Sequence, residues 1–93
     1  MAELHIRSRP FKIHNVEQRR TLGITAKSLS DVREHASSKF FLTPGSCRIF
    51  LEDFTEVENE DYFRYIVDQT NLIVVGDRLR GEWMSGIWGA TLN

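Results

Sequence analysis

The sequence predicts an α+β fold, in which one mixed sheet of four or five strands carries a single main helix across one face. Three observations support this prediction. Apolar and polar residues alternate in two stretches before residue 28 and again after residue 46, which is the period of a half-buried strand. One stretch between them has the helical period instead. The 93 residues, 41% of them apolar, suit one domain with one core.

The first two strands are predicted at residues 10–16 and 22–27. In the first, Phe11 and Ile13 point to one side while the residues between them point to the other. Pro10 is tolerated at the start of a strand. The second stretch alternates in the same way, and the short polar segment between the two can turn. We therefore expect a β-hairpin.

The main helix is predicted over residues 28–40. Ser28 and Asp31 fit a capping box, in which a side chain at the start of the helix binds a backbone N–H three residues on. Four apolar residues then fall on one helical stripe, which we expect to face the sheet: Leu29, Val32, Ala36 and Phe40.

The second half of the chain predicts shorter elements around one long strand. Residues 47–51 alternate and predict a third long strand, followed by a short strand at 55–57 and a short helix near 59–66. Residues 72–75 form a continuous apolar run, which predicts a central strand buried on both faces or nearly so. A sheet with the helix on one face accommodates this order of elements.

Composition limits where the protein acts and what it contains. Cys47 is the only cysteine, which rules out an intramolecular disulfide and favours a reducing, intracellular compartment, cytoplasmic or nuclear. Its place on the apolar side of a strand predicts a core residue and not a nucleophile. The N-terminal residues lack the apolar segment of a signal peptide, and no run approaches the ~20 apolar residues of a membrane span.

Charge is strongly polarised along the chain, although the net charge is only −1. Residues 1–48 hold nine Lys or Arg and four acids, a balance of +5. Residues 49–93 hold three Arg and nine acids, a balance of −6. Six of the 13 acids fall within EDFTEVENED, residues 52–61. This acidic segment is the most informative part of the sequence.

Ligand spacing excludes a calcium loop in the acidic segment. An EF-hand that began at Asp53 would have Val57 at a ligand position, and one that began at Glu56 would have Asp61 where Gly is required. The histidines and Cys47 have no zinc-ligand spacing. No phosphate-binding glycine loop or nucleophile motif is present, so we expect no catalytic residues, no metal and no cofactor.

Direct nucleic-acid binding is disfavoured, because no RNP-type aromatic motif is present and the acidic half would repel a polyanion. Two interpretations of the acids remain. Glu60 and Asp61 would favour the dipole of a helix that starts beside them, which leaves the other acids merely solvated. Alternatively, six acids without compensating Lys or Arg indicate a partner of opposite charge. The basic half of another copy, or of a homologous domain, could supply that charge.

The motifs PFKIHN, LGITAKSLSDVREHASSKF, RIFLEDFTEVENEDYF and GEW resemble the CIDE-N (CAD) domain. This is the N-terminal regulatory domain of the caspase-activated DNase, of its inhibitor and of the cell-death-inducing effectors. The resemblance covers residues 9–83, between an N-terminal extension (1–8) and a tail or linker (84–93). The PGSCRIFLED connection is closer to the nuclease subfamily than to the inhibitor.

The resemblance implies a ubiquitin-like β-grasp roll whose two charge clusters lie on opposite faces. Carried over position by position, the basic face comprises Lys12, Arg19, Arg20, Lys27 and Arg33. The acidic face comprises Asp53, Glu56, Glu58, Glu60 and Asp61.

In this family such faces pair head to tail, which implies a homotypic interaction domain that regulates apoptotic DNA fragmentation and can form helical filaments. The expected partners are homologous CIDE-N domains and copies of itself, with no membrane involved. The domain itself would not be an enzyme, and the active site of a DNase parent would lie beyond residue 93. The alternatives are a ubiquitin-like modifier, which a chain ending in GATLN without Gly-Gly argues against, and a DNA-contacting regulatory domain.

One residue departs from the family pattern. The family usually has DGTEV where this chain has Asp53, Phe54 and Thr55. Glycine at that position would permit a tight turn with positive φ. Phe54 therefore either changes the turn or presents an exposed aromatic side chain beside the acids, where it could act as an interface anchor.

Overall fold

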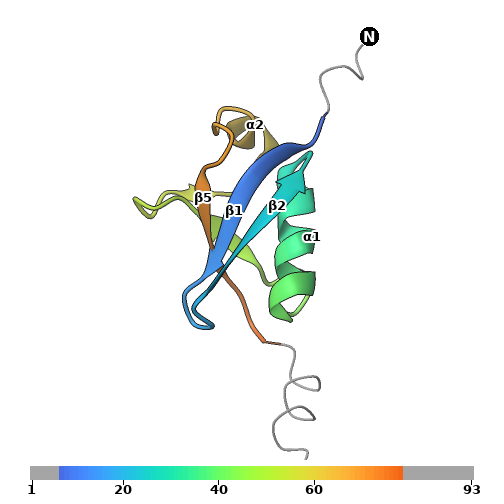
Figure 1. Ribbon diagram of the computed structural model, residues 1–93, viewed down its shortest axis with the longest axis vertical. Coiled ribbons are helices and arrows are strands. Elements are labelled where there is room, and N and C mark those ends of the chain that lie inside the picture. Colours follow the sequence, from blue (N-terminus) through green and yellow to red (C-terminus); the bar gives the residue numbers. More distant parts are fainter. Residues whose placement is uncertain (1–6, 79–93) are drawn as a thin grey trace, which may run out of the picture.

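The computed structural model describes residues 7–78, and its elements follow the predicted order (Figure 1). They are β1 (Arg9–Asn15), β2 (Arg20–Ala26), α1 (Leu29–Phe40), β3 (Arg48–Phe50), β4 (Glu56–Val57), α2 (Glu60–Phe63) and β5 (Asn71–Val75). The predicted tail (84–93) lies outside the described residues, as does all of the predicted N-terminal extension except residues 7 and 8. The predicted domain boundaries therefore stay a prediction.

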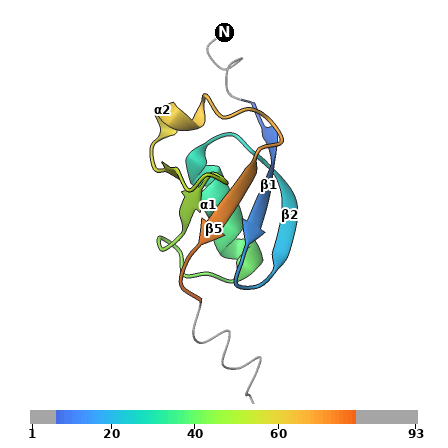
Figure 2. The same ribbon diagram turned by 90° about the vertical axis from the view of Figure 1, so that its left-hand side faces the viewer.

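The strands form one mixed sheet in the order β2-β1-β5-β3-β4. Strand β1 pairs antiparallel with β2 and parallel with β5, while β3 pairs antiparallel with both β5 and β4. Helix α1 packs across one face, and Figure 2 looks onto the sheet with α1 behind it. This arrangement confirms the predicted α+β, β-grasp fold. It also places β2 and β4 at opposite edges.

The β1–β2 hairpin has the register that the alternating pattern predicts. Phe11 lies opposite Ile24, and Ile13 opposite Leu22, so that their apolar side chains face α1. Asn15 ends β1 as a buried polar residue, and its side-chain oxygen accepts a hydrogen bond of 2.8 Å from the backbone N–H of Gln18. This contact fixes the turn between the strands.

Helix α1 begins as the capping motif predicts. The Ser28 hydroxyl accepts a hydrogen bond of 3.1 Å from the backbone N–H of Asp31, whose carboxylate accepts one of 2.9 Å from the N–H of Lys27. The helix ends at Phe41, which has a φ of 56° and donates its N–H to the Ser37 carbonyl. This left-handed C-cap is more often occupied by Gly.

The core lies between α1 and the sheet. The predicted helical stripe is buried throughout. The sheet and its connections contribute the remaining buried apolar side chains: Phe11, Ile13, Ile24, Ala26, Leu42, Cys47, Ile49, Val57, Phe63, Ile66, Leu72 and Val74. The prediction that Cys47 is a core residue is confirmed.

Two strand predictions were wrong in detail. The predicted long strand at 47–51 is reduced to three residues, because the chain turns into a tight hairpin at Leu51. The apolar run at 72–75 is central in the sheet but is not buried on both faces. Leu72 and Val74 face the core, whereas Val75 on the helix-free face is 49% exposed. The all-apolar run therefore correctly indicated a central strand, but it did not indicate that both faces of the strand are buried.

Candidate interaction surfaces

The acidic segment forms the β3–β4 hairpin, strand β4 and the start of α2. Leu51 accepts a hydrogen bond of 2.9 Å from the N–H of Phe54, and it donates its own N–H to the Thr55 carbonyl at 2.8 Å. The Asp53 carboxylate accepts a hydrogen bond of 3.0 Å from the Thr55 N–H. These bonds close a three-residue connection, which projects from the body of the domain (Figure 1).

Phe54 adopts the positive-φ turn conformation that a glycine would favour at this position. Its φ is 72°, and its side chain is 83% exposed. The position after a two-residue turn in such a hairpin usually takes Gly, which has no Cβ to clash in the left-handed region. The glycine-like geometry and the exposed aromatic side chain, which the sequence posed as alternatives, therefore occur together.

Glu56 is paired within the hairpin. Its carboxylate accepts two hydrogen bonds from the Arg48 guanidinium, at 2.9 and 3.1 Å. This contact holds the pKa of Glu56 below its ordinary value of 4.5. The pKa of Asp53 is also lowered, through its hydrogen bonds with Thr55. The idea that the acids have no compensating Lys or Arg was therefore wrong for Glu56, and an exposed ion pair with Arg64 makes it wrong for Asp61 as well.

Glu60 serves the fold. Its carboxylate accepts hydrogen bonds from the backbone N–H of Leu29 at 2.8 Å and of Ser30 at 3.1 Å. The carboxylate thus closes the start of α1 and ties α2 to it, where a negative charge is favoured. Within residues 7–78, the Asp61 side chain makes only an exposed ion pair of 3.5 Å with Arg64, and the Glu58 side chain makes no hydrogen bond or ion pair. Among the residues of the predicted acidic face, Glu58 and Asp61 make the fewest side-chain contacts that support the fold.

The predicted basic residues are spread over a wider area. Arg19 lies in the β1–β2 turn with a φ of 56°, and Arg20 follows it at the start of β2. The Arg20 guanidinium donates 3.2 Å to the Lys39 carbonyl and lies over the Phe40 ring, 5.8 Å from its centroid. The turn is thereby attached to the end of α1, and this adds Lys39, which the sequence reasoning had missed, to the same area.

Two further predicted basic residues lie away from that turn. Lys12 is exposed on the helix-free face of β1, opposite Gly23. Lys27 follows the other end of β2, about 20 Å along a seven-residue strand from Arg20. Neither the side chain of Lys12 nor that of Arg19 makes a hydrogen bond or ion pair with the described part of the chain, although the backbone N–H of Lys12 donates to the Thr70 carbonyl at 3.1 Å.

Arg33 is separate from the other four. Arg33 belongs to α1, whereas the other four lie on or directly beside β1 and β2. Burial raises the pKa of the Cys47 thiol, and the positive charge of Arg33 partly opposes that rise. The same charge makes a small contribution to the lowered pKa of Glu56, after the Arg48 hydrogen bond. A common role for all five basic residues stays a prediction.

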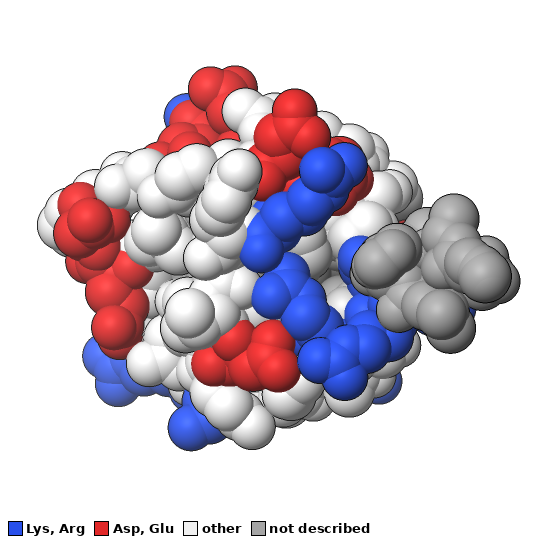
Figure 3. Space-filling model, turned by 90° about the horizontal axis from the view of Figure 1, so that it is seen from above, with Lys and Arg blue, Asp and Glu red and all other residues white. Residues whose placement is uncertain are grey.

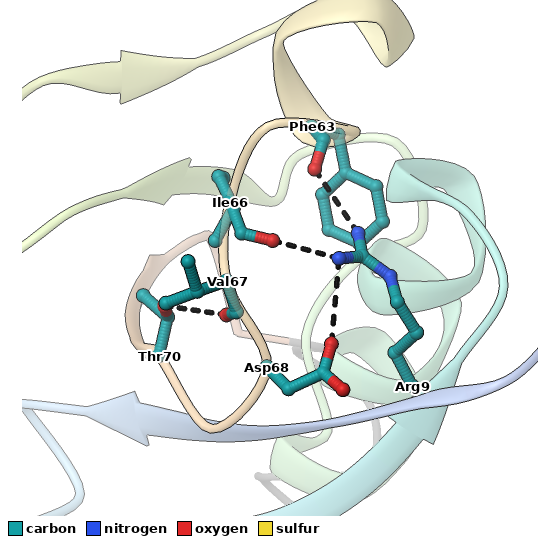
Figure 4. Close-up of polar contacts among 6 residues, drawn as sticks. All are labelled: Arg9, Phe63, Ile66, Val67, Asp68 and Thr70. Carbon is teal, nitrogen blue, oxygen red and sulfur yellow. Dashed lines mark hydrogen bonds and ion pairs between the residues drawn. The ribbon is translucent and has the colours of Figure 1, made fainter.

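Arg9 is a basic residue that belongs to the fold (Figure 4). Its guanidinium donates hydrogen bonds to the backbone carbonyls of Ile66 at 2.7 Å and Phe63 at 3.1 Å, and it approaches the Asp68 carboxylate at 3.5 Å. It also lies over the rings of Phe11 and Phe63, about 5 Å from each centroid. Arg9 therefore anchors the loop after α2 to β1 and is not available to an external phosphate.

Opposite charges interleave where α2 lies. Figure 3, which looks down on that end of the molecule, shows acidic side chains at several separate places with basic side chains between them.

Within residues 7–78, no three His, Cys, Asp or Glu side chains are grouped so that they could hold a metal ion. Over the same residues, no helix is long and apolar enough to cross a membrane.

Comparison with known proteins shows what this arrangement resembles. The family model for the CIDE-N domain matches residues 8–80. The CIDE domain of Drep4 is 32% identical with a TM-score of 0.68, over 78% of this chain and 85% of that one. Cell death-inducing DFFA-like effector c is 28% identical with a TM-score of 0.66, over 78% and 95%.

A third similar structure contains two partners. The heterodimeric complex between the CAD domains of CAD and ICAD matches with a TM-score of 0.65 and 24% identity, over 83% of this chain and 81% of that one. At that identity the likeness concerns the fold alone. No curated protein gives a significant match.

Proposed function

This chain is a member of the CIDE-N domain family, and from that membership we propose that it pairs head to tail through its basic face and its acidic face. CIDE-N domains are protein-interaction domains of apoptosis and are not themselves catalytic. The partner is a second copy of this chain or a homologous CIDE-N domain. The CAD domains of CAD and ICAD, which share this fold, form such a heterodimeric complex with each other.

The observation that carries the proposal is the separation of charge across the sheet. Arg19 and Arg20 lie at the β2 edge, and the acidic hairpin lies at the β4 edge, with three strands between. Two different surfaces that are complementary to each other make heterologous contacts, which either close into rings or continue as open helical filaments. An assembly of this kind would tether a nuclease to its inhibitor, or assemble the nuclease once it is free, in apoptotic DNA fragmentation.

Exposed ion pairs are weak one by one, at about 0.2–1 kcal/mol each, so several must act together. They mainly govern the rate and orientation of association, and salt screens them. The Debye length falls from ~10 Å at 0.1 M to ~3 Å at 1 M ionic strength. Association should therefore weaken steeply with salt.

The test uses two charge-reversal variants that spare the hydrogen bonds of the fold. The basic-blocked variant carries Lys12→Glu with Arg19→Glu. The acid-blocked variant carries Glu58→Lys with Asp61→Lys and loses only the exposed pair with Arg64.

Sedimentation velocity at low ionic strength should find concentration-dependent oligomers of the wild type, and monomers of either variant. A 1:1 mixture of the variants should form a dimer that cannot extend. Oligomers that persist in both variants, or a mixture that stays monomeric, would contradict the proposal.

A further inference from the structure

The exposed aromatic ring of Phe54 makes no ring–ring or cation–π contact within residues 7–78. It stands 83% exposed at a position with a φ of 72°. For a bulky side chain a positive φ is a genuine outlier, and in general such outliers collect where a structure serves binding or catalysis. Glycine would relieve the clash, and a polar residue would be better solvated. The stability of the monomer therefore does not account for phenylalanine here.

The surroundings of Phe54 indicate the kind of surface that it would meet. Glu52 and Asp53 precede it in the turn, both exposed, and the hairpin projects from the domain (Figure 1). An apolar side chain set among carboxylates fits a surface in which an apolar patch is bordered by cations. Such an arrangement has the form of an interface anchor with a charged rim.

The domain carries such a surface at the β1–β2 turn and the end of α1. Val16 is 61% exposed in that turn, and Phe41 is 52% exposed just after the helix. The turn is held to the helix end by Gln18, which donates 2.7 Å to the Phe40 carbonyl, and by Arg20, which donates to the Lys39 carbonyl. Arg19, Arg20 and Lys39 lie in the same turn and helix end as these two exposed apolar side chains. Glu17, the one acid of the turn, approaches Arg78 at 3.8 Å.

We propose that Phe54 is the apolar anchor of the head-to-tail contact, and that it docks against Val16 and Phe41 of a second copy of this chain. The charge of the two surfaces is complementary, with acids around the anchor and cations around its acceptor. The hairpin and the acceptor lie at different places on one domain, so one copy can offer both at the same time. This inference rests on the proposed function and adds a residue-specific determinant to it.

The mixture of blocked variants isolates one interface and gives a matched control. The basic-blocked variant contributes only its acidic side, and the acid-blocked variant only its basic side. Phe54→Gly in the basic-blocked variant should raise the dissociation constant of the mixed dimer about tenfold or more, as for loss of a buried anchor. The same substitution in the acid-blocked variant should leave it unchanged. Isothermal titration calorimetry at fixed ionic strength measures both.

The acceptor surface is tested by placing its substitution in the other partner of the mixed dimer. Val16→Ser should weaken the dimer when it is in the acid-blocked variant and have no effect in the basic-blocked one. Combined across the interface, Phe54→Gly and Val16→Ser should cost less than the product of their separate effects, because they remove one contact. Independent effects would place the anchor elsewhere and overturn the acceptor assignment.

Two variants control for the fold and for exposure. Phe54→Tyr retains the ring and should bind like the wild type. Tyr65→Ala removes a ring that is 82% exposed outside the hairpin and should not change affinity. Equal binding by Phe54→Gly, or an equal loss with Tyr65→Ala, would overturn the anchor while leaving the charge-based function intact. If the blocked variants form no dimer at all, the proposed function and this inference fall together.

Discussion

The acidic and basic sides of this domain differ in how far their charges are used by the fold itself. In the acidic segment, Glu56 binds Arg48, Glu60 closes the start of α1, and Asp53 holds its own turn. On the basic side, Arg20 binds the end of α1, whereas Lys12 and Arg19 make no side-chain hydrogen bond or ion pair with residues 7–78. A charge that the fold does not use can be reversed without harm to the monomer. A charge that the fold also uses cannot.

This difference decides how charge reversal should be interpreted. Substitution of Glu60 removes a helix cap as well as a surface charge, so a loss of association could reflect a damaged monomer. Glu58 and Asp61 avoid that ambiguity. The difference between bonded and free charges is tested by measuring the stability of monomers with single substitutions.

The largest expected effect contrasts two basic residues of β1. Arg9→Ala should lower the free energy of unfolding by about 2–3 kcal/mol, because it removes charge-assisted hydrogen bonds to two carbonyls and two cation–π contacts. Lys12→Ala, three residues on, should stay within about 0.5 kcal/mol of the wild type. Urea unfolding of both measures the contrast. Similar values for the two would show that Arg9 is as free as Lys12.

A smaller effect is expected at the start of α1. Glu60→Ala should cost about 1–2 kcal/mol, because two backbone N–H groups lose their acceptor. Glu60→Gln retains an acceptor oxygen and should cost less. The matched control is Glu58→Ala, which should be close to neutral. If Glu60→Ala and Glu58→Ala unfold at the same urea concentration, the capping role is refuted.

The smallest effect is a dependence on pH. The pKa of Glu56 is lowered in the folded state from its ordinary value of 4.5, so the unfolded chain takes up this proton first as pH falls. The stabilisation is therefore present above about pH 4.5 and is lost as pH falls through the folded pKa. Thermal unfolding from pH 6 to pH 3 should show a shallower loss for Glu56→Gln than for the wild type. Parallel curves would mean that the pair with Arg48 does not form in solution.

Local patterns predicted much of this fold. Alternation located the β1–β2 hairpin, and the capping box together with the apolar stripe located α1 to within a residue. The length of β3 could not be predicted in the same way. Its end depends on the tight turn after Leu51, and Phe54 occupies the turn position where a Gly would have indicated that turn. Burial of β5 depends on which face α1 covers, which is a property of the whole sheet.

The charged surfaces were less predictable than the fold. The acids cluster in sequence, but their partners come from elsewhere: the start of α1 for Glu60, and the neighbouring strand for Glu56. Strand parity could have suggested the pair with Arg48, since both residues lie on the helix-free side of the hairpin.

The most direct test of head-to-tail pairing is to map both sides of one contact by NMR. The basic-blocked variant is labelled with ¹⁵N and titrated with the unlabelled acid-blocked variant, and the labelling is then reversed. In the first titration, shifts should concentrate in residues 52–61, and in the second around the β1–β2 turn and the end of α1. If the same residues shift in both titrations, the contact is symmetric and head-to-tail pairing is contradicted.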